Sequence, residues 1–345
     1  MDLKSTLNKY GVVGAGSFGI AIANLLAENG EVLLYARTEE QVKEINEKHF
    51  SRGYELNPGI KAIDNLKLIA QECQLIFPII PSDNFVDFLD EIAPYLSPAH
   101  ILIHGTKGLY TPKQLNTDTD IIKEEIYTMS ELIQLKTGVI RVGCLAGPNL
   151  ASELADKQPA ATVIASKFNE VIKEGQNALT SNRFQVYGSN DILGIELAGV
   201  LKNYIAIASG MLSGLGYGEN ARALLITRGM GELIYIAKSL GASEKAFLGL
   251  AGIGDLIATC NSEKSRNFRV GYYLAKGKKI DEIIKEIGEV AEGIKTLQIV
   301  KLLQRYGFKA PIAEVLYRII FEDFPIQKGI NLLMSFTVSK DAEYI

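Results

Sequence analysis

The apolar positions of the first 190 residues predict an alternation of short strands and helices. Gly11-Val12-Val13 ends a short apolar strand, residues 17–29 carry apolar side chains at helical spacing, and residues 32–35 are predicted as the next strand. Further strands are predicted, in chain order, at residues 75–80, 101–104, 139–145, 161–165 and 184–187. Such an alternation is typical of a mainly parallel sheet covered by helices on both faces.

After about Gly188 the apolar positions recur almost only at helical spacing. The Gly-Ser-Asn run at 188–190 breaks the preceding pattern and Asp191 can cap a following helix, so a domain boundary is predicted here. Helices are predicted at residues 191–211, 222–240, 269–276, 281–287, 295–306 and 311–321. The expected fold class is an α/β domain over residues 1–189, followed by an all-α domain over residues 190–345.

The most apolar long stretch, residues 192–215, raises the question of a membrane span. Glu196, Lys202 and Asn203 interrupt it, whereas a span needs about 20 predominantly apolar residues. We therefore predict a buried helix and no stable membrane insertion. Residues 1–10 are polar and lack the apolar core of a signal peptide.

Composition and charge narrow the function classes. Of the 345 residues, 47% are hydrophobic and 22% are charged, so the chain can bury a core and remain soluble. A net charge of −4 leaves no basic excess for a nucleic-acid partner. The cysteines and histidines show neither a C-x-x-C pair nor metal-ligand spacing, which favours a reducing cytosol and chemistry without a metal. They are Cys73, Cys144, Cys260, His49, His100 and His104.

The segment Gly14-Ala15-Gly16-Ser17-Phe18-Gly19 matches G-x-G-x-x-G, the phosphate loop of Rossmann domains. It follows a predicted strand and opens a predicted helix, which is the context that this motif requires. The first glycine allows a tight turn, the second lets a pyrophosphate approach the backbone, and the third lets helix and strand pack closely. The helix N-terminus offers N–H groups to the phosphates, so a nicotinamide dinucleotide is predicted. The alternative is a tight turn without a ligand.

The end of the second strand bears on the choice of cofactor. An Asp or Glu at this point would bind the ribose 2′-hydroxyl of NAD, but the order here is Tyr35-Ala36-Arg37. Arg37 can pair with a 2′-phosphate, so NADP(H) is expected to be accepted alongside NAD(H). The alternative for Arg37 is a solvated surface side chain.

Two charged residues lie within apolar runs, and one of them, Lys202, lies in a predicted helix. A buried lysine such as Lys202 is costly unless it is paired or its pKa is lowered, and an amine of the latter kind can donate a proton near neutral pH. Asp255, in Gly252-Ile253-Gly254-Asp255-Leu256, poses the same question. The alternatives are a lysine that extends from the helix edge to solvent and an aspartate that caps a helix.

Two further polar segments are candidate ligand contacts. Lys107 follows the strand at 101–104, and the carboxyl ends of parallel strands face the ligand crevice. Ser265-Arg266-Asn267 begins a predicted helix, where amides and a planar guanidinium suit an anion. The alternatives are an ordinary loop lysine and a solvated helix start.

Taken together, these segments resemble bacterial-type NAD(P)-dependent glycerol-3-phosphate dehydrogenase over nearly the whole chain. The order and spacing of the motifs carry the resemblance far more than the glycine loop alone. They are the glycine loop, Ile80-Pro81-Ser82, Thr106-Lys107-Gly108-Leu109, Ala146-Gly147-Pro148-Asn149, Leu201-Lys202-Asn203, residues 222–229, residues 251–256, Ser265-Arg266-Asn267, Val290-Ala291-Glu292-Gly293 and Ala310-Pro311-Ile312.

The resemblance implies a role for each matching position. Catalysis would involve Lys202, Lys107 and Asp255. Substrate contacts would come from Lys107, Gly147, Asn149, Lys202, Asp255, Ser265, Arg266 and Asn267. Contacts to the cofactor would come from Gly14, Gly16, Ser17, Phe18, Gly19, Arg37, Lys107, Ala151, Arg266, Val290 and Glu292. Three departures stand out: Ala146 and Asn149 replace the family's usual serine and Ser/Thr, and residues 49–58 fit poorly.

The implied reaction interconverts dihydroxyacetone phosphate and glycerol 3-phosphate, with Lys202 moving the proton and NADPH or NADH carrying the hydride. In the family the product feeds phospholipid synthesis in the cytoplasm. Two rivals are a reductase of a β-hydroxyacid or ketopantoate, and a dinucleotide sensor without catalysis; neither gives a reason for all of these motifs. The sequence leaves open the cofactor preference, feedback control and the oligomeric state, a homodimer among the options.

Overall fold

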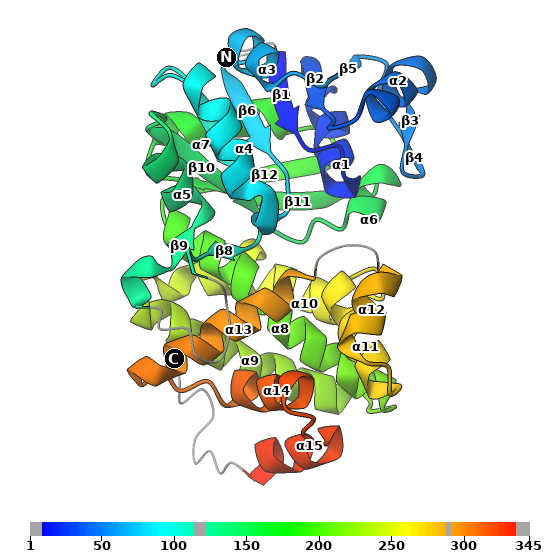
Figure 1. The fold of residues 1–345 in the computed structure, drawn as a ribbon, viewed down its shortest axis with the longest axis vertical. Coiled ribbons are helices and arrows are strands. Elements are labelled where there is room, and N and C mark those ends of the chain that lie inside the picture. The colour runs from blue at the N-terminus through cyan, green and yellow to red at the C-terminus, as the bar shows by residue number, and fades with distance from the viewer. Residues whose placement is uncertain (1–8, 114–121, 288–290, 336–345) are drawn as a thin grey trace. The chain divides into compact units, whose positions relative to one another are not determined.

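A computed structural model of the chain describes residues 9–113, 122–287 and 291–335 (Figure 1). These fall into two compact units, residues 1–110 with 127–192 and residues 111–126 with 193–345. The main division follows Ile192, close to the sequence break at 188–190. Residues 111–126 group with the second unit, although the sequence pattern gave no sign that this segment leaves the first.

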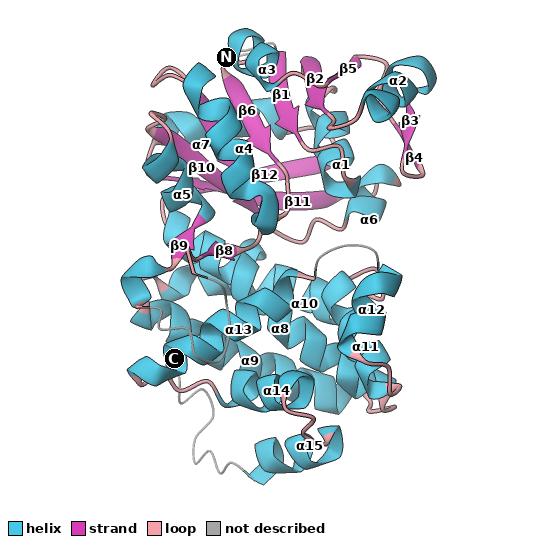
Figure 2. Ribbon diagram, in the orientation of Figure 1, coloured by secondary structure: helices cyan, strands magenta, loops and turns pink. Residues whose placement is uncertain are grey.

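The first unit is built on an eight-stranded sheet in the order β12-β11-β10-β7-β6-β1-β2-β5 (Figure 2). Every neighbouring pair is parallel except β10 with β11, so the predicted mainly parallel sheet is confirmed. The strands are β1 (Lys9–Val13), β2 (Glu31–Tyr35), β5 (Ile60–Ile63), β6 (Leu75–Pro78), β7 (Ile101–His104), β10 (Arg141–Ala146), β11 (Ala160–Ser166) and β12 (Phe184–Ser189). The edge strand β5 was not predicted, because it is short and Lys61 interrupts its apolar run.

Helices cover both faces of this sheet, because successive side chains of a strand point to opposite faces. Val12 of β1 belongs to one buried cluster and its neighbour Val13 to another. The first cluster includes α1 (Ser17–Leu26), α6 (Ala151–Ala155) and α7 (Asn169–Leu179). The second includes α3 (Leu66–Glu72), α4 (Phe85–Ile92) and α5 (Met129–Lys136). This is the two-sided α/β layering of a Rossmann domain.

Smaller elements complete the first unit. Two short hairpins are β3 (Phe50–Ser51) with β4 (Tyr54–Glu55), and β8 (Leu109–Tyr110) with β9 (Tyr127–Thr128). Helix α2 (Glu39–Lys48) begins at Thr38, whose hydroxyl accepts from the Gln41 amide. The Gln41 side chain in turn donates to the carbonyl of Ala15 at 3.0 Å, so α2 is tied to the glycine loop.

The described part of the second unit is helical throughout. Its α-helices are α8 (Ile192–Gly214), α9 (Glu219–Ser239), α10 (Asp255–Cys260), α11 (Arg266–Ala275), α12 (Ile280–Ile287), α13 (Glu292–Leu303), α14 (Pro311–Phe321) and α15 (Ile326–Ser335). The predicted helices correspond to α8, α9 and α11–α14 within a few residues. Helices α10 and α15 were not predicted. The first is short and follows the glycine-rich π turn Leu250–Gly254.

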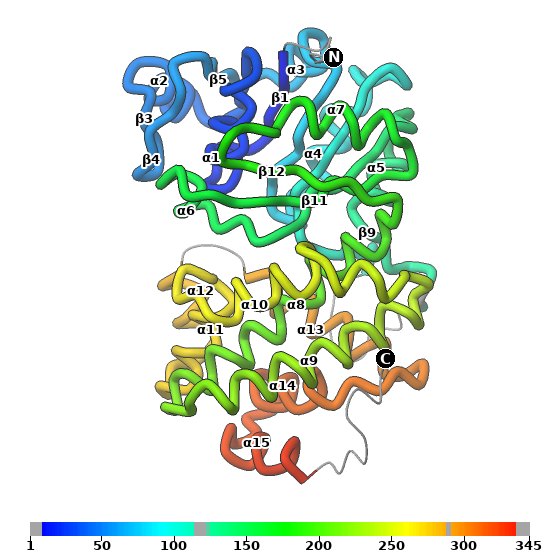
Figure 3. Tube along the Cα trace, turned by 180° about the vertical axis from the view of Figure 1, so that it is seen from behind, coloured from blue at the N-terminus to red at the C-terminus, as the bar shows by residue number. Residues whose placement is uncertain are grey.

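Helix α8 is the core of the second unit (Figure 3). It is long and apolar enough to cross a membrane, but 89% of its most apolar window is buried by the protein. Two glycines let α11 cross it at backbone contact. A Cβ at Gly210 would lie 1.9 Å from the Phe268 carbonyl oxygen, and one at Gly271 would lie 1.8 Å from that of Ile207. Only hydrogen side chains fit this crossing, which fixes α11 against the helix that carries Lys202.

Candidate active site

The three glycines of the glycine loop differ in what surrounds the position that a Cβ would take. A Cβ at Gly14 would lie 2.3 Å from the Ile79 carbonyl oxygen, and one at Gly19 would lie 1.8 Å from that of Gly14. A Cβ at Gly16 would meet nothing within 4 Å. Gly16 is the N-cap of α1 and makes no side-chain cap, and no acid lies in the first turn. Space above Gly16 and uncapped amides are what a dinucleotide phosphate requires.

The end of β2 lies beside this loop. The Gly14 amide donates to the Tyr35 carbonyl oxygen at 3.2 Å, and Arg37 is exposed just beyond the strand. The first acidic residues after the strand, Glu39 and Glu40, lie in the first turn of α2. The exposed Arg37 guanidinium thus occupies the stretch where NAD-specific domains carry an acid.

The carboxyl ends of β7 and β10 bring Lys107 and Gly147 together. The two strands are parallel neighbours, and Lys107 Nζ donates to the Gly147 carbonyl oxygen at 3.3 Å. Asn149 follows in the same loop, with its side-chain amide 2.8 Å from the Thr162 hydroxyl oxygen. Ala151 is the first residue of α6. The predicted residues of the first unit thus lie on the loops and the first turns of the helices that follow the carboxyl ends of its strands.

In the second unit, Lys202 of α8 is buried and paired rather than extended to solvent. Its ammonium lies 2.7 Å from Asp255 Oδ1, and each residue is only 3–4% exposed. The ammonium also contacts the Thr259 hydroxyl, which donates to the Asp255 carbonyl oxygen. The N-cap of α10 is Gly254, so Asp255 does not cap this helix. Removing one charge from such a pair leaves the other unpaired in the interior, which typically costs 3–5 kcal/mol.

Thr259 is the member of this group that the sequence analysis missed. The available signal is its position four residues after Asp255, which places both side chains on one face of α10. Its polar atom is hidden in an otherwise apolar run, Leu256-Ile257-Ala258. Because α10 itself was not predicted, this spacing carried no weight in the sequence alone.

Three of the motifs meet in a second hydrogen-bonded chain beside this pair. Asn267 Nδ2 donates to Asn203 Oδ1 at 3.0 Å, and Asn267 Oδ1 accepts from the Gly293 amide at 3.0 Å. Ser265 caps α11 by accepting from the Phe268 amide, and Arg266 is exposed in the first turn. Glu292 is the first residue of α13, and the predicted cofactor contact Val290 lies outside the described residues.

A second buried carboxylate in this unit has a different environment. Glu232 of α9 is 3% exposed and accepts from the Tyr204 hydroxyl and from the Ile312 and Ala313 amides at the start of α14. Burial raises the pKa of Glu232 to about 7, against the lowering effect of these hydrogen bonds. Asp255 has an ammonium beside it, whereas the partners of Glu232 are a hydroxyl and two amides.

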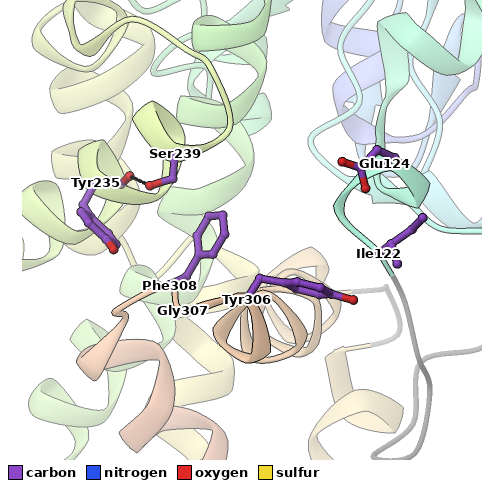
Figure 4. A pocket seen from close by; sticks show the side chains of 7 residues that line it. All are labelled: Ile122, Glu124, Tyr235, Ser239, Tyr306, Gly307 and Phe308. Atoms are coloured by element: carbon purple, nitrogen blue, oxygen red, sulfur yellow. Dashed lines mark hydrogen bonds between the residues drawn. The ribbon is translucent and has the colours of Figure 1, made fainter.

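In the described part of the chain, the predicted site residues form no metal-binding cluster, include no thiol and line no part of a cavity in the second unit. In those residues no cluster of three or more His, Cys, Asp or Glu side chains is placed to hold a metal. The three cysteines are buried free thiols, and burial raises the pKa of Cys73 and Cys260 to about 12. A cavity of about 560 Å³ in the second unit is lined by none of the residues predicted for the site (Figure 4). Its lining is Ile122, Glu124, Tyr235, Ser239, Tyr306, Gly307 and Phe308.

A Rossmann sheet with an uncapped glycine turn, joined in one chain to a helical unit with a buried lysine, is the architecture of an NAD(P)-dependent dehydrogenase. The family models agree. The N-terminal model of NAD-dependent glycerol-3-phosphate dehydrogenase matches residues 9–172, and the C-terminal model matches residues 191–331. The chain belongs to this family of NAD(P)-dependent oxidoreductases, as its motifs predict.

Individual relatives extend over both units. Glycerol-3-phosphate dehydrogenase [NAD(P)+] of Ectopseudomonas mendocina is 40% identical, with 98% of each chain covered. The solved structure of glycerol-3-phosphate dehydrogenase from Coxiella burnetii has a TM-score of 0.85 and 31% identity, covering 95% of this chain and 99% of that one. A ketopantoate reductase from Ralstonia eutropha, the class of the nearest rival, has a TM-score of 0.53 and 17% identity, and therefore shares the fold alone.

Proposed function

We propose that this enzyme interconverts dihydroxyacetone phosphate and sn-glycerol 3-phosphate with NADH or NADPH. Relatives that match over both units are named glycerol-3-phosphate dehydrogenase [NAD(P)+]. The observation that carries the proposal is the buried contact of Lys202 with Asp255 at 2.7 Å. This contact holds the Lys202 ammonium, which carries a proton, inside the helical unit. The other unit is the Rossmann domain that is expected to bind the dinucleotide. We extend the proposal to a cytoplasmic enzyme that supplies glycerol 3-phosphate for phospholipid synthesis.

Lys202 is proposed as the acid–base group. During reduction its ammonium gives a proton to the alkoxide oxygen that develops at the carbonyl, and in the reverse direction its amine removes that proton. Asp255 and Thr259 both hold the ammonium, so its direction is set before substrate arrives. The bound dinucleotide supplies or accepts the hydride. Its phosphates suit the amides at Gly16 and Ser17, with Phe18 following.

The substrate phosphate is proposed to bind at the start of α11. Arg266 is exposed there, and the α11 N-terminus provides amides and a partial positive charge. Asn267 is fixed by Asn203 and Gly293, which orders this end of the helix. Phosphate binding at a distance from the carbonyl would position the reacting carbon. Lys107, held by the Gly147 carbonyl, is proposed to polarise the substrate oxygen.

The test is a steady-state assay of dihydroxyacetone phosphate reduction, followed as NADH or NADPH oxidation in parallel. We expect turnover with both cofactors, because Arg37 stands where an acid would repel the 2′-phosphate. Ketopantoate is the matched substrate control, and we expect no turnover with it. Turnover of ketopantoate and not of the triose phosphate would refute the proposal. For Arg266→Ala, the KM for the triose phosphate should rise strongly, and an unchanged KM would remove Arg266 from the phosphate site.

A further inference from the structure

The loop that follows β10 is held against β11 at both of its ends. At one end the Thr162 hydroxyl donates to the Ala146 carbonyl oxygen at 3.1 Å. At the other end the Asn149 carboxamide lies 2.8 Å from the same hydroxyl oxygen, with its oxygen oriented to accept from that hydroxyl and its nitrogen to donate to the Ala161 carbonyl oxygen of β11 at 3.2 Å. Thr162 is fully buried, so this oxygen is shielded from water and its two contacts persist without competition. One side chain therefore fixes a loop of four residues.

The backbone between these two points lies directly on β11. A Cβ at Gly147 would lie 3.1 Å from both the Ala161 carbonyl oxygen and Thr162 Cα. The peptide is pressed against the strand at the point where its carbonyl oxygen turns to accept from Lys107 Nζ at 3.3 Å. The direction of that carbonyl, and with it the position of the ammonium, thus depends on how the loop sits on Thr162.

We propose that Thr162 is a positioning residue of the active site: its hydroxyl, through Ala146 and Asn149, sets the Gly147 carbonyl that holds the Lys107 ammonium. The inference rests on the proposed function, in which Lys107 contacts the phosphorylated ketone. It also gives Asn149, a departure from the family's usual Ser or Thr, a specific task. An asparagine amide reaches one bond further than a hydroxyl, and here it spans from the loop to β11.

The decisive variant is Thr162→Val, which keeps the side-chain shape and removes the hydroxyl. We expect kcat/KM for dihydroxyacetone phosphate to fall about tenfold, because the loop loses its contacts with the Thr162 hydroxyl and the Gly147 carbonyl is no longer held in its direction toward Lys107. Thr162→Ser restores the hydroxyl and should stay within about twofold of the wild type. This rescue separates the hydroxyl from the packing of the strand.

Ser166 on the same strand provides a matched control. It is also fully buried, and its hydroxyl donates to the Val142 carbonyl oxygen of β10 at 2.6 Å, away from the loop. Ser166→Ala removes the same kind of bond between the same strands. Its kcat/KM should stay within about twofold of the wild type. An equal loss in Ser166→Ala and Thr162→Val would overturn the proposal, since any loosening of β10 on β11 would then suffice.

A double-mutant cycle tests the route of the effect. Asn149→Ala and Thr162→Val remove the two sides of one contact, so their effects on kcat/KM should be clearly less than multiplicative when combined. Fully multiplicative effects would mean that the residues act separately, against the proposal. So would a Thr162→Val enzyme with wild-type kcat/KM, or a Thr162→Ser enzyme as impaired as Thr162→Val.

Amide hydrogen exchange keeps this inference apart from the proposed function. A wild-type enzyme that does not turn over dihydroxyacetone phosphate would refute the function. The loop would still be testable through the peptide that spans residues 144–154. We expect that peptide to exchange at least tenfold faster in Thr162→Val than in wild type or Ser166→Ala. Unchanged exchange would show that Thr162 does not hold the loop.

Discussion

The glycine loop and the Lys202 pair are two parts of one enzyme built in opposite ways. The loop is proposed to bind the dinucleotide through backbone amides. Its glycines avoid a clash at Gly14 and Gly19 and leave the space over Gly16 open. The lysine site is made of polar side chains buried among apolar ones, each dependent on a partner. A binding surface made of backbone amides is disrupted when a side chain is added. A buried polar cluster is instead destabilised when one of its hydrogen-bonding or charged partners is removed.

The largest effect should come from Lys202→Met, which keeps the apolar stem and removes the charge. We expect kcat to fall by about 10²–10⁴-fold, the usual contribution of an acid–base group. The buried Asp255 carboxylate, without the ammonium beside it, would also destabilise the unit. Lys202→Met combined with Asp255→Asn should recover thermal stability without recovering kcat. Activity of the single variant within about tenfold of wild type would exclude Lys202 from proton transfer.

Alanine at two glycines of the loop should separate folding from binding. Gly19→Ala places a Cβ against the Gly14 carbonyl and should lower the free energy of unfolding by about 3 kcal/mol or more. Gly16→Ala meets nothing within 4 Å and should change it by less than about 1 kcal/mol. The Gly16 variant should instead raise the KM for the dinucleotide at least tenfold. Equal effects of the two variants on stability would contradict this division of roles.

Asp255 and Glu232, both buried, offer a comparison inside the helical unit. Because the pKa of Glu232 is raised to about 7 in the folded state, its proton stabilises the fold at low pH, and this contribution is lost as pH rises from about 4.5 to about 7. The loss amounts to about 3 kcal/mol. Glu232→Gln should remove this pH dependence from the free energy of unfolding, measured in urea from pH 5 to 8.5. If the free energy of unfolding changed with pH in the same way for wild type and variant, the pKa of folded Glu232 would not be raised to about 7.

Thr259→Val should give the smallest effect of the series. It removes one side-chain partner of the ammonium but leaves the Asp255 pair intact. A fall in kcat of about tenfold would fit the loss of one orienting hydrogen bond. The matched variant Thr259→Ser keeps the hydroxyl and should retain activity. If Thr259→Val were as damaging as Lys202→Met, the hydroxyl would have to take part in the proton transfer itself.

The same contrast explains what could be predicted from the sequence. The glycine loop, the alternation of strands and helices, and the helices α8, α9 and α11–α14 follow from local patterns, which the chain shows without its tertiary structure. Lys202 and Asp255 were found because charge is conspicuous in an apolar run. Their pairing joins residues 53 positions apart, and no local pattern contains it.

The residues that were missed have tertiary causes. Thr259 has only a hydroxyl to mark it as polar, and it lies on a helix too short to predict. Thr162 is a β-branched residue, a type common in buried strands, so the sequence does not distinguish it. Strand β5 is too short to show a clear pattern, and helix α15 packs against α14. In α15, for instance, Gly329 packs close to Val315 and Ile319. Residues 111–126 belong to the second unit, and nothing in the sequence pattern shows which unit this polar segment joins.

The contact of α8 with α11 through Gly210 and Gly271 has a consequence for which molecules the enzyme accepts. One helix carries the proposed proton donor and the other the proposed phosphate anchor, and their backbones touch, so the spacing between the two helices at this crossing is fixed. Discrimination by chain length would then reside in two glycines that never meet the substrate. If Gly271→Ala folds, the ratio of kcat/KM for a three-carbon over a four-carbon phosphorylated ketone should fall. An unchanged ratio would assign this discrimination to the contacting side chains instead.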